Sequence, residues 1–169
     1  MGFFVWLEQT RLSAWINQSD SILAYPSILL LHTIGMTLLG GLNIVIALRI
    51  LGFASKMPVA ELQKTFPLIW IGFILSAASG VLLLAAKATQ FFYNPAFYIK
   101  MASIVFAVII FFAIRARVFR DPLLDKRPIQ MNGKVLALLS IILWLGAITA
   151  GRVMAYVGEA SEFGALILK

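Results

Sequence analysis

His32 is the only histidine in the chain, and it lies inside the apolar run "SILLLHTIGMTLLGGLNIVIALRILG" at 27–52. A neutral imidazole can ligate a metal ion, and it is the usual protein ligand of haem iron. The same ring could instead hydrogen-bond a neighbouring helix. The sequence therefore raises two hypotheses for His32, a haem ligand and a structural polar group.

Methionine thioethers are the other candidate ligands. Met101 and Met154 lie within apolar runs, and methionine serves as an axial haem ligand or as a soft ligand for Cu(I). Met36 and Asn43 follow His32 at helical spacing on one face, so Met101 or Met154 is better placed for the opposite side of a haem. Filling the core is the alternative role. Because the chain has no cysteine, zinc–thiolate and cysteine-ligated iron–sulfur sites are excluded.

The elements that must position these side chains are membrane helices. The chain is 62% hydrophobic and 12% charged, whereas soluble domains are nearer half apolar and a quarter charged. Crossing a bilayer takes about 20 apolar residues, and four stretches are long enough, at about 22–51, 66–86, 95–119 and 135–157. The sequence predicts an all-α integral membrane protein, a four-transmembrane-helix bundle that forms one membrane domain over 1–169.

The start of the chain predicts a different element. Residues 2–16 contain Phe, Trp and Leu interrupted by Glu8 and Arg11, a pattern typical of an amphipathic helix lying at the membrane interface. A signal peptide is not expected, because no basic residue precedes the apolar stretch.

Basic residues predict the orientation. Nine of the 14 lysines and arginines lie in or beside the first and third loops, namely Arg49, Lys56, Lys64, Arg115, Arg117, Arg120, Lys126, Arg127 and Lys134. By the positive-inside rule these loops are cytoplasmic. We therefore expect a multi-pass protein of the bacterial inner membrane with both termini periplasmic. The net charge of +7 fits anionic headgroups, and no nucleic-acid partner is expected.

Three cations near the ends of the spans join His32 as candidate site residues. A central Lys or Arg costs about 2.5–3.5 kcal/mol on insertion scales, so intramembrane charges usually mark sites. Lys100 and Arg152 are expected roughly five to seven residues of helix rise above His32, where they could pair with haem propionates. Snorkelling to headgroups is their alternative role. Arg49 closes the first helix, where headgroups and the helix dipole also account for it.

The segments "LLHTIGMTLLGGLNIVIALRILG" and "FYIKMASIVFAVIIFF" together resemble the CopD/HemJ-like group of four-helix bacterial membrane proteins. Its HemJ-type members bind haem b and act as protoporphyrinogen oxidases. They carry a Leu-His pair in the first core helix, an Arg near its cytoplasmic end and a Lys at the head of a later helix. His32, Arg49 and Lys100 match that pattern, so the resemblance implies haem b held by His32.

These observations favour a haem b-binding membrane protein for electron transfer, or for tetrapyrrole or quinone-linked redox chemistry such as a protoporphyrinogen oxidase-like activity. His32 would ligate the iron, with Lys100, Arg152 and Arg49 as cofactor-binding residues and Met101 or Met154 as a second ligand. Expected partners are the lipid bilayer and a quinone or porphyrin. Assembly as a homo-oligomer or within a larger membrane complex is also expected. Two alternative functions remain open, a non-catalytic accessory subunit of a larger membrane complex and a small copper transporter.

Overall fold

The computed structural model describes residues 6, 8–19, 21, 23–121 and 128–167, and every regular element in this part of the chain is helical. Four stretches are long and apolar enough to cross a bilayer: Tyr25–Leu51, Ala60–Ala86, Pro95–Arg117 and Met131–Met154. The prediction of an all-α, four-helix integral membrane protein is confirmed.

A π-helical turn interrupts the first span. Helix α3 covers Tyr25–Met36, a π-helical segment covers Thr37–Gly41, and α4 covers Leu42–Leu51. The helix begins at Tyr25 rather than at 22, because Pro26 lies in its first turn, where a missing N–H is tolerated. It ends as predicted at 51, since Gly52 adopts the left-handed conformation with φ of 112° that is typical of the residue after a helix.

The second span follows the predicted boundaries. Helix α5 covers Phe66–Ala86, and the short 3₁₀ segment Ala60–Thr65 leads into it. Pro67 again occupies the first turn. The agreement arises because polar residues flank the apolar run closely on both sides.

The third and fourth spans differ from the prediction mainly at their ends. After α6 (Ala88–Phe92), helix α7 covers Pro95–Arg117. The Asn94 side chain caps α7 by accepting a hydrogen bond from the Ala96 N–H at 2.9 Å. The predicted end at 119 is two residues too long, because the chain turns after two arginines. The predicted 135–157 lies within α8, which covers Met131–Ile167.

The predicted amphipathic N-terminal helix is described only in part, and residues 6 and 8 within it are helical. Of the predicted 2–16, residues 2–5 and 7 lie outside the described residues, and helix α2 covers Arg11–Gln18. It starts there because the Thr10 Oγ1 accepts a hydrogen bond from the Ser13 N–H at 3.4 Å. Ile16 is buried against α5, while Trp15 is exposed. The helix therefore rests on one end of the bundle and presents a tryptophan outward.

Ser13 fastens α2 to the second span. Its hydroxyl donates to the Ala85 carbonyl of α5 at 2.8 Å, and a hydrogen bond of this kind contributes about 1 kcal/mol. We expect Ser13→Ala to accelerate hydrogen exchange of the α2 amides by about fivefold, measured by mass spectrometry in detergent. Ser103→Ala on α7 is the control that should leave this exchange unchanged. An unchanged rate in Ser13→Ala would contradict the assignment.

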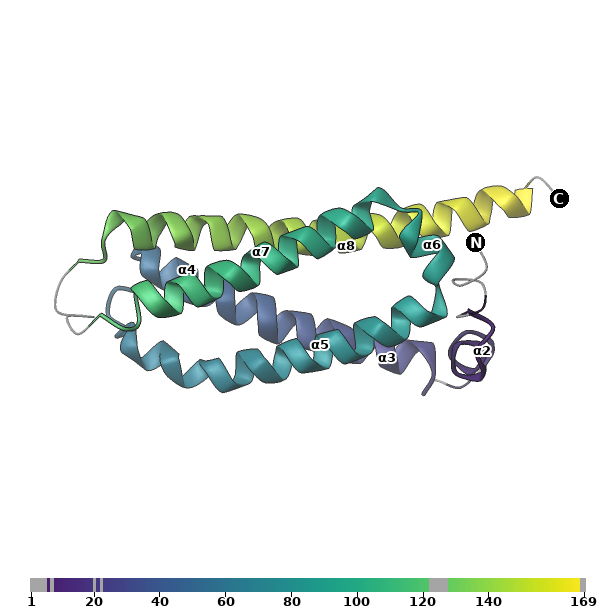
Figure 1. Ribbon diagram of the computed structural model, residues 1–169, viewed down its shortest axis with the longest axis horizontal. Helices are drawn as coiled ribbons and strands as arrows, with labels where there is room; N and C mark the ends of the chain where they lie inside the picture. The colour runs from purple at the N-terminus through teal and green to yellow at the C-terminus, as the bar shows by residue number, and fades with distance from the viewer. Residues whose placement is uncertain (1–5, 7, 20, 22, 122–127, 168–169) are drawn as a thin grey trace.

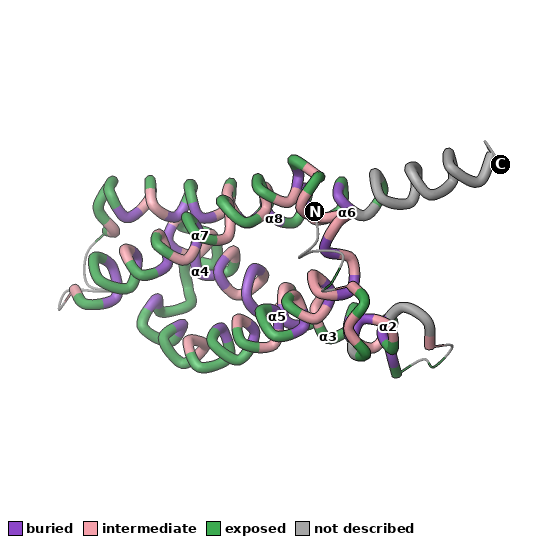
Figure 2. Tube along the Cα trace, turned by 45° about the vertical axis from the view of Figure 1, so that its right-hand side comes forward, coloured by how far each residue is buried: buried purple, intermediate pink, exposed green. Residues whose placement is uncertain are grey.

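The helices form two pairs joined by α4. Helix α3 packs along α5, α7 packs along α8, and α4 packs along α8 (Figure 1). The largest core cluster lies around α4 and includes Leu39, Ile46, Phe111 and Trp144. In Figure 2, buried residues lie between helices and exposed ones lie outside. Large apolar side chains such as Ile74 and Val105 are exposed, as expected for surfaces that face lipid.

The backbones of α3 and α5 meet at two glycines. A Cβ on Gly35 would lie 2.6 Å from the Ser76 backbone nitrogen, and a Cβ on Gly72 would lie 2.8 Å from the Leu39 backbone nitrogen. No side chain fits at such distances, so glycine is required on both sides of the crossing. This close approach brings α5 against the helix that carries His32.

Candidate functional site

The His32 imidazole is held by the backbone of α5. Its Nδ1 lies 3.0 Å from the Ser76 carbonyl oxygen and 3.1 Å from the Ser79 hydroxyl. A carbonyl oxygen can only accept, so Nδ1 carries a proton and donates it. The Ser79 hydroxyl donates to the Leu75 carbonyl at 2.6 Å, and it therefore accepts from His32. In the neutral ring, Nε2 keeps its lone pair and can act as a ligand.

Gly80 lets the ring lie directly on α5. A Cβ at this position would be 3.2 Å from the His32 Cε1 and 3.5 Å from Nδ1. Ser76, Ser79 and Gly80 are therefore the contacts that set the ring's position. The segment 76–80 combines small residues typical of close helix packing with the groups that hold the histidine.

Lys100 is brought to the same region from the third span. It lies on α7, is half-buried, and is close enough to His32 for the two side chains to interact electrostatically. Its side chain packs on α8, where a Cβ on Gly151 would lie 3.7 Å from the Lys100 Nζ. Among the side chains that the structure describes, no carboxylate pairs with Lys100. A cation at this position can neutralise an anionic ligand group.

The two arginines of the predicted site differ in position. Arg152 directly follows Gly151 on α8, and its side chain is exposed. Arg49 lies at the far end of the first span, where it donates to the backbone carbonyls of Met57 and Ser55. These bonds fasten the loop after α4. The structure thus brings His32 and Lys100 together and leaves Arg49 apart from them.

The predicted second ligands differ in burial. Met154 is buried on α8, whereas Met101 on α7 is 45% exposed. Met36 packs against the core cluster around α4. Within the described residues, no three His, Cys, Asp or Glu side chains come together to hold a metal ion. Haem iron needs only one or two protein ligands, so this donor set fits a haem better than a bare cation.

Asn43 does not share a site with His32. Its amide donates to the Leu39 carbonyl at 2.7 Å and is buried, and it lines a pocket with residues of α5, α7 and α8. The π-helical turn between His32 and Asn43 accommodates an additional residue and rotates the helix beyond it. The predicted common face of His32 and Asn43 is therefore wrong.

All four spans fall within one known family. A family model described as a family of unknown function (DUF6644) matches residues 3–157. The chain belongs to DUF6644. No curated protein and no solved structure matches the chain. The matched region includes both residues of the His32–Lys100 pair.

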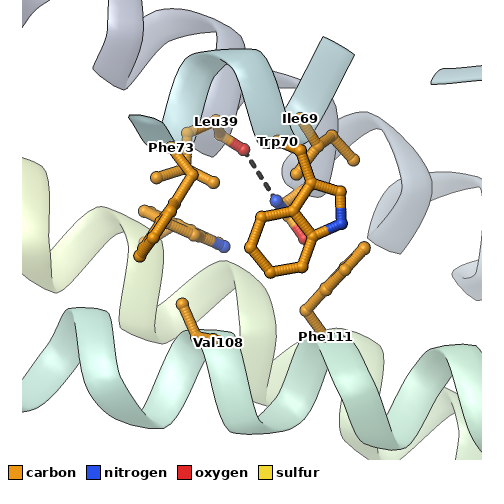
Figure 3. Close-up of a pocket in the computed structure, with 8 residues that line it drawn as sticks. Leu39, Ile69, Trp70, Phe73, Val108 and Phe111 are labelled. Carbon is orange, nitrogen blue, oxygen red and sulfur yellow. Dashed lines mark hydrogen bonds between the residues drawn. The ribbon is translucent and has the colours of Figure 1, made fainter. Parts of the chain in front are cut away.

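The pocket beside Asn43 is a feature of this DUF6644 member that was not predicted from the sequence. It is lined by side chains from every span, namely Leu39, Asn43, Ile69, Trp70, Phe73, Val108, Phe111 and Trp144. Figure 3 shows Trp70 and Phe73 of α5 facing Val108 and Phe111 of α7 across the space. A signal was present, since Asn43 and Trp144 are isolated polar-tipped residues within apolar runs, and such groups usually have partners.

Proposed function

We propose that this protein binds haem b in the membrane through His32 and serves in electron transfer. The observation that carries the proposal is the bond from the His32 Nδ1–H to the Ser76 carbonyl, at 3.0 Å. Histidines that ligate metals usually donate their other ring nitrogen to a carbonyl or carboxylate, which fixes the ring and raises its basicity. His32 has this arrangement in the protein itself.

Each surrounding residue has a distinct part in this proposal. Ser76 and Ser79 orient the imidazole so that Nε2 is the ligating atom. Lys100 supplies the positive charge that an anionic haem substituent requires at membrane depth, and the adjacent exposed Arg152 adds a second one. Bound haem iron would carry one electron at a time between its ferric and ferrous states.

Of the two candidate second ligands, Met154 rather than Met101 would hold the haem. Burial on α8 supports Met154, because Met101 is 45% exposed. A thioether ligand generally raises the haem potential compared with a second imidazole. We assign Arg49 a structural role, because its guanidinium already donates to two loop carbonyls.

The proposal also includes a location in the membrane and a class of reaction. We place the protein in the bacterial inner membrane with both termini periplasmic, because the basic residues gather in the first and third loops. The resemblance to the CopD/HemJ-like group supports redox chemistry, and an oxidase activity on a porphyrinogen is its enzymatic form.

An absorption spectrum of the purified protein in detergent tests the proposal. A Soret band, a reduced α band and a b-type pyridine haemochrome are expected, in the preparation itself or after titration with hemin. A folded, monodisperse preparation that binds no hemin would exclude haem. Cu(I) binding that depends on Met101 and Met154, with no visible spectrum, would favour a copper transporter instead.

Lys100 offers a separate prediction. Lys100→Met removes the charge and keeps an apolar side chain of similar length, and we expect haem to bind about tenfold or more weakly, because a bond to a charged group is worth roughly 1.5–3 kcal/mol. Lys100→Arg should retain most of the affinity. Hemin titration of the variant proteins measures this. Lys56→Met, at an exposed loop position, is the control, and equal affinities in the two methionine variants would contradict the assigned part of Lys100.

A further inference from the structure

Arg115 lies where α5 begins and α7 ends, at the left of Figure 1. Its guanidinium stands over the Phe66 ring of α5, with the guanidinium carbon 5.7 Å from the ring centroid. A guanidinium attracted to an aromatic face keeps the N–H groups of its own plane for other acceptors. Phe66 in turn packs edge to face on Phe111 and Phe119, with ring centroids 5.4 and 5.0 Å apart. Arg115 is therefore a cation held in place between two spans.

The positive charge of Arg115 is not balanced by a carboxylate in the described part of the chain. Glu61, at the start of the second span, pairs with Lys64 at 2.5 Å, and Asp121 follows the turn after α7. Among the residues that the structure describes, no ion pair forms at Arg115 or at Arg117. Both arginines are exposed. An anionic group from outside the chain can therefore neutralise them.

An exposed aromatic surface continues from Arg115 toward the middle of the membrane. Phe112, one turn earlier on α7, has its ring centroid 5.9 Å from that of Trp70 on α5. The Trp70 side chain is 36% exposed and that of Phe112 is 44% exposed, although both belong to spans. In a bilayer such a surface contacts acyl chains. The cation and the aromatic surface thus follow each other as the headgroup and the acyl chains of a phospholipid do.

We propose that one anionic phospholipid binds between the start of α5 and the end of α7. Its phosphate accepts hydrogen bonds from the Arg115 guanidinium, and an acyl chain lies on Trp70 and Phe112. A guanidinium and a phosphate form paired, charge-assisted hydrogen bonds, and basic residues between membrane helices bind anionic headgroups. The lipid would bridge one helix of each helix pair. The site requires neither haem nor a particular orientation of the chain in the membrane.

A general attraction of the basic loops to an anionic leaflet is a different explanation, and it makes a different prediction. Such an attraction depends on the total charge near the membrane surface, so Arg115 and Arg117 would contribute equally. Arg117 is two residues, or about 200°, further around α7, so it leaves the helix in another direction. A phospholipid bound between α5 and α7 depends on Arg115 alone. Arg115→Gln and Arg117→Gln therefore form a matched pair.

Native mass spectrometry of the detergent-solubilised protein measures the binding. The probe is phosphatidylglycerol, which is anionic, and the control is zwitterionic phosphatidylcholine with the same acyl chains. We expect phosphatidylglycerol to bind at least about fivefold more tightly. Arg115→Gln should weaken this binding by about tenfold, whereas Arg117→Gln should change it by less than about twofold. Glycerol 3-phosphate, which carries the anionic group without acyl chains, should not displace the lipid.

A second pair of variants tests the acyl-chain part of the site. Phe112→Ala removes a ring from the exposed aromatic surface, and it should weaken the binding of both lipids by about threefold. Phe106→Ala removes another exposed phenylalanine of α7, six residues away and on a different side of the helix. This control should bind phosphatidylglycerol as the unaltered protein does.

Preferential binding of phosphatidylglycerol that is lost in Arg115→Gln and kept in Arg117→Gln supports the site. Equal binding of the two lipids, equal losses in the two arginine variants, or displacement by glycerol 3-phosphate overturns it. Equal binding by Phe112→Ala and Phe106→Ala also overturns it, and this comparison still decides if Arg115→Gln fails to fold.

Discussion

His32→Ala is expected to lose about nine-tenths or more of its bound haem, because alanine offers no ligand atom and imidazole is the principal iron ligand of b-type sites. The chain has no other histidine to replace it. The reduced-minus-oxidised spectrum and the haem content per protein measure the loss. The variant should remain folded, because the helix accepts alanine readily.

Imidazole and a matched variant separate ligation from a general disturbance of α3. Free imidazole added to His32→Ala should restore part of the Soret band by occupying the space of the missing ring. Thr37→Ala is the control, since Thr37 is exposed and its hydroxyl donates to the Thr33 carbonyl of its own span, at 2.8 Å. Unchanged haem content and spectrum in His32→Ala would rule out His32 as the ligand.

Gly35→Ala is expected to be the most disruptive single-methyl change in the bundle. The added Cβ would lie 2.6 Å from the Ser76 backbone nitrogen and 2.9 Å from its Cα, and a backbone cannot yield as a flexible side chain does. Overpacking of this kind costs about 1–3 kcal/mol. Because Ser76 also accepts the His32 hydrogen bond, separating the helices should displace the imidazole too. Unfolding by SDS, followed by circular dichroism, measures the stability.

Gly41→Ala is the control for this crossing. Gly41 lies in the same span, yet a Cβ there would meet nothing within 4 Å. We expect this variant to be as stable as the unaltered protein or slightly more stable, because alanine restricts the unfolded chain more than glycine does. Equal stability of Gly35→Ala and Gly41→Ala would show that the α3 and α5 backbones can move apart at Gly35 without loss of stability.

The membrane architecture could be predicted because the bilayer imposes a simple rule on sequence. A helix of about 20 apolar residues must cross it, so the run at 66–86 alone defined α5. The helix starts at Pro26 and Asn94 arise from local chemistry that a sequence displays, since proline suits a first turn and asparagine caps a helix. The start of α2 could not be predicted from composition, since it depends on one hydrogen bond at Thr10.

The site could be predicted only in part, because its geometry depends on contacts between spans. The type and setting of His32 indicated a ligand, and the Lys100 position placed a cation near it. That Ser76 would present its carbonyl to His32 follows from the Gly35–Gly72 crossing, which no local pattern specifies. The packing of Gly40, within the π-helical turn, against the Trp144 ring is likewise a contact between spans, where a Cβ would lie 3.3 Å away.

That π-helical turn changes the rotation of α4 about the helix axis relative to α3, so the side chains of the two halves point in different directions than a regular α-helix would give. Each residue added to or removed from a helix rotates everything beyond it by about 100°. Removing Gly41, where an added Cβ would meet nothing within 4 Å, would return the span to a regular α-helix and turn His32 and Asn43 relative to each other. The one additional residue in the π-helical turn thus lets His32 and Asn43, on the same span, face different parts of the bundle.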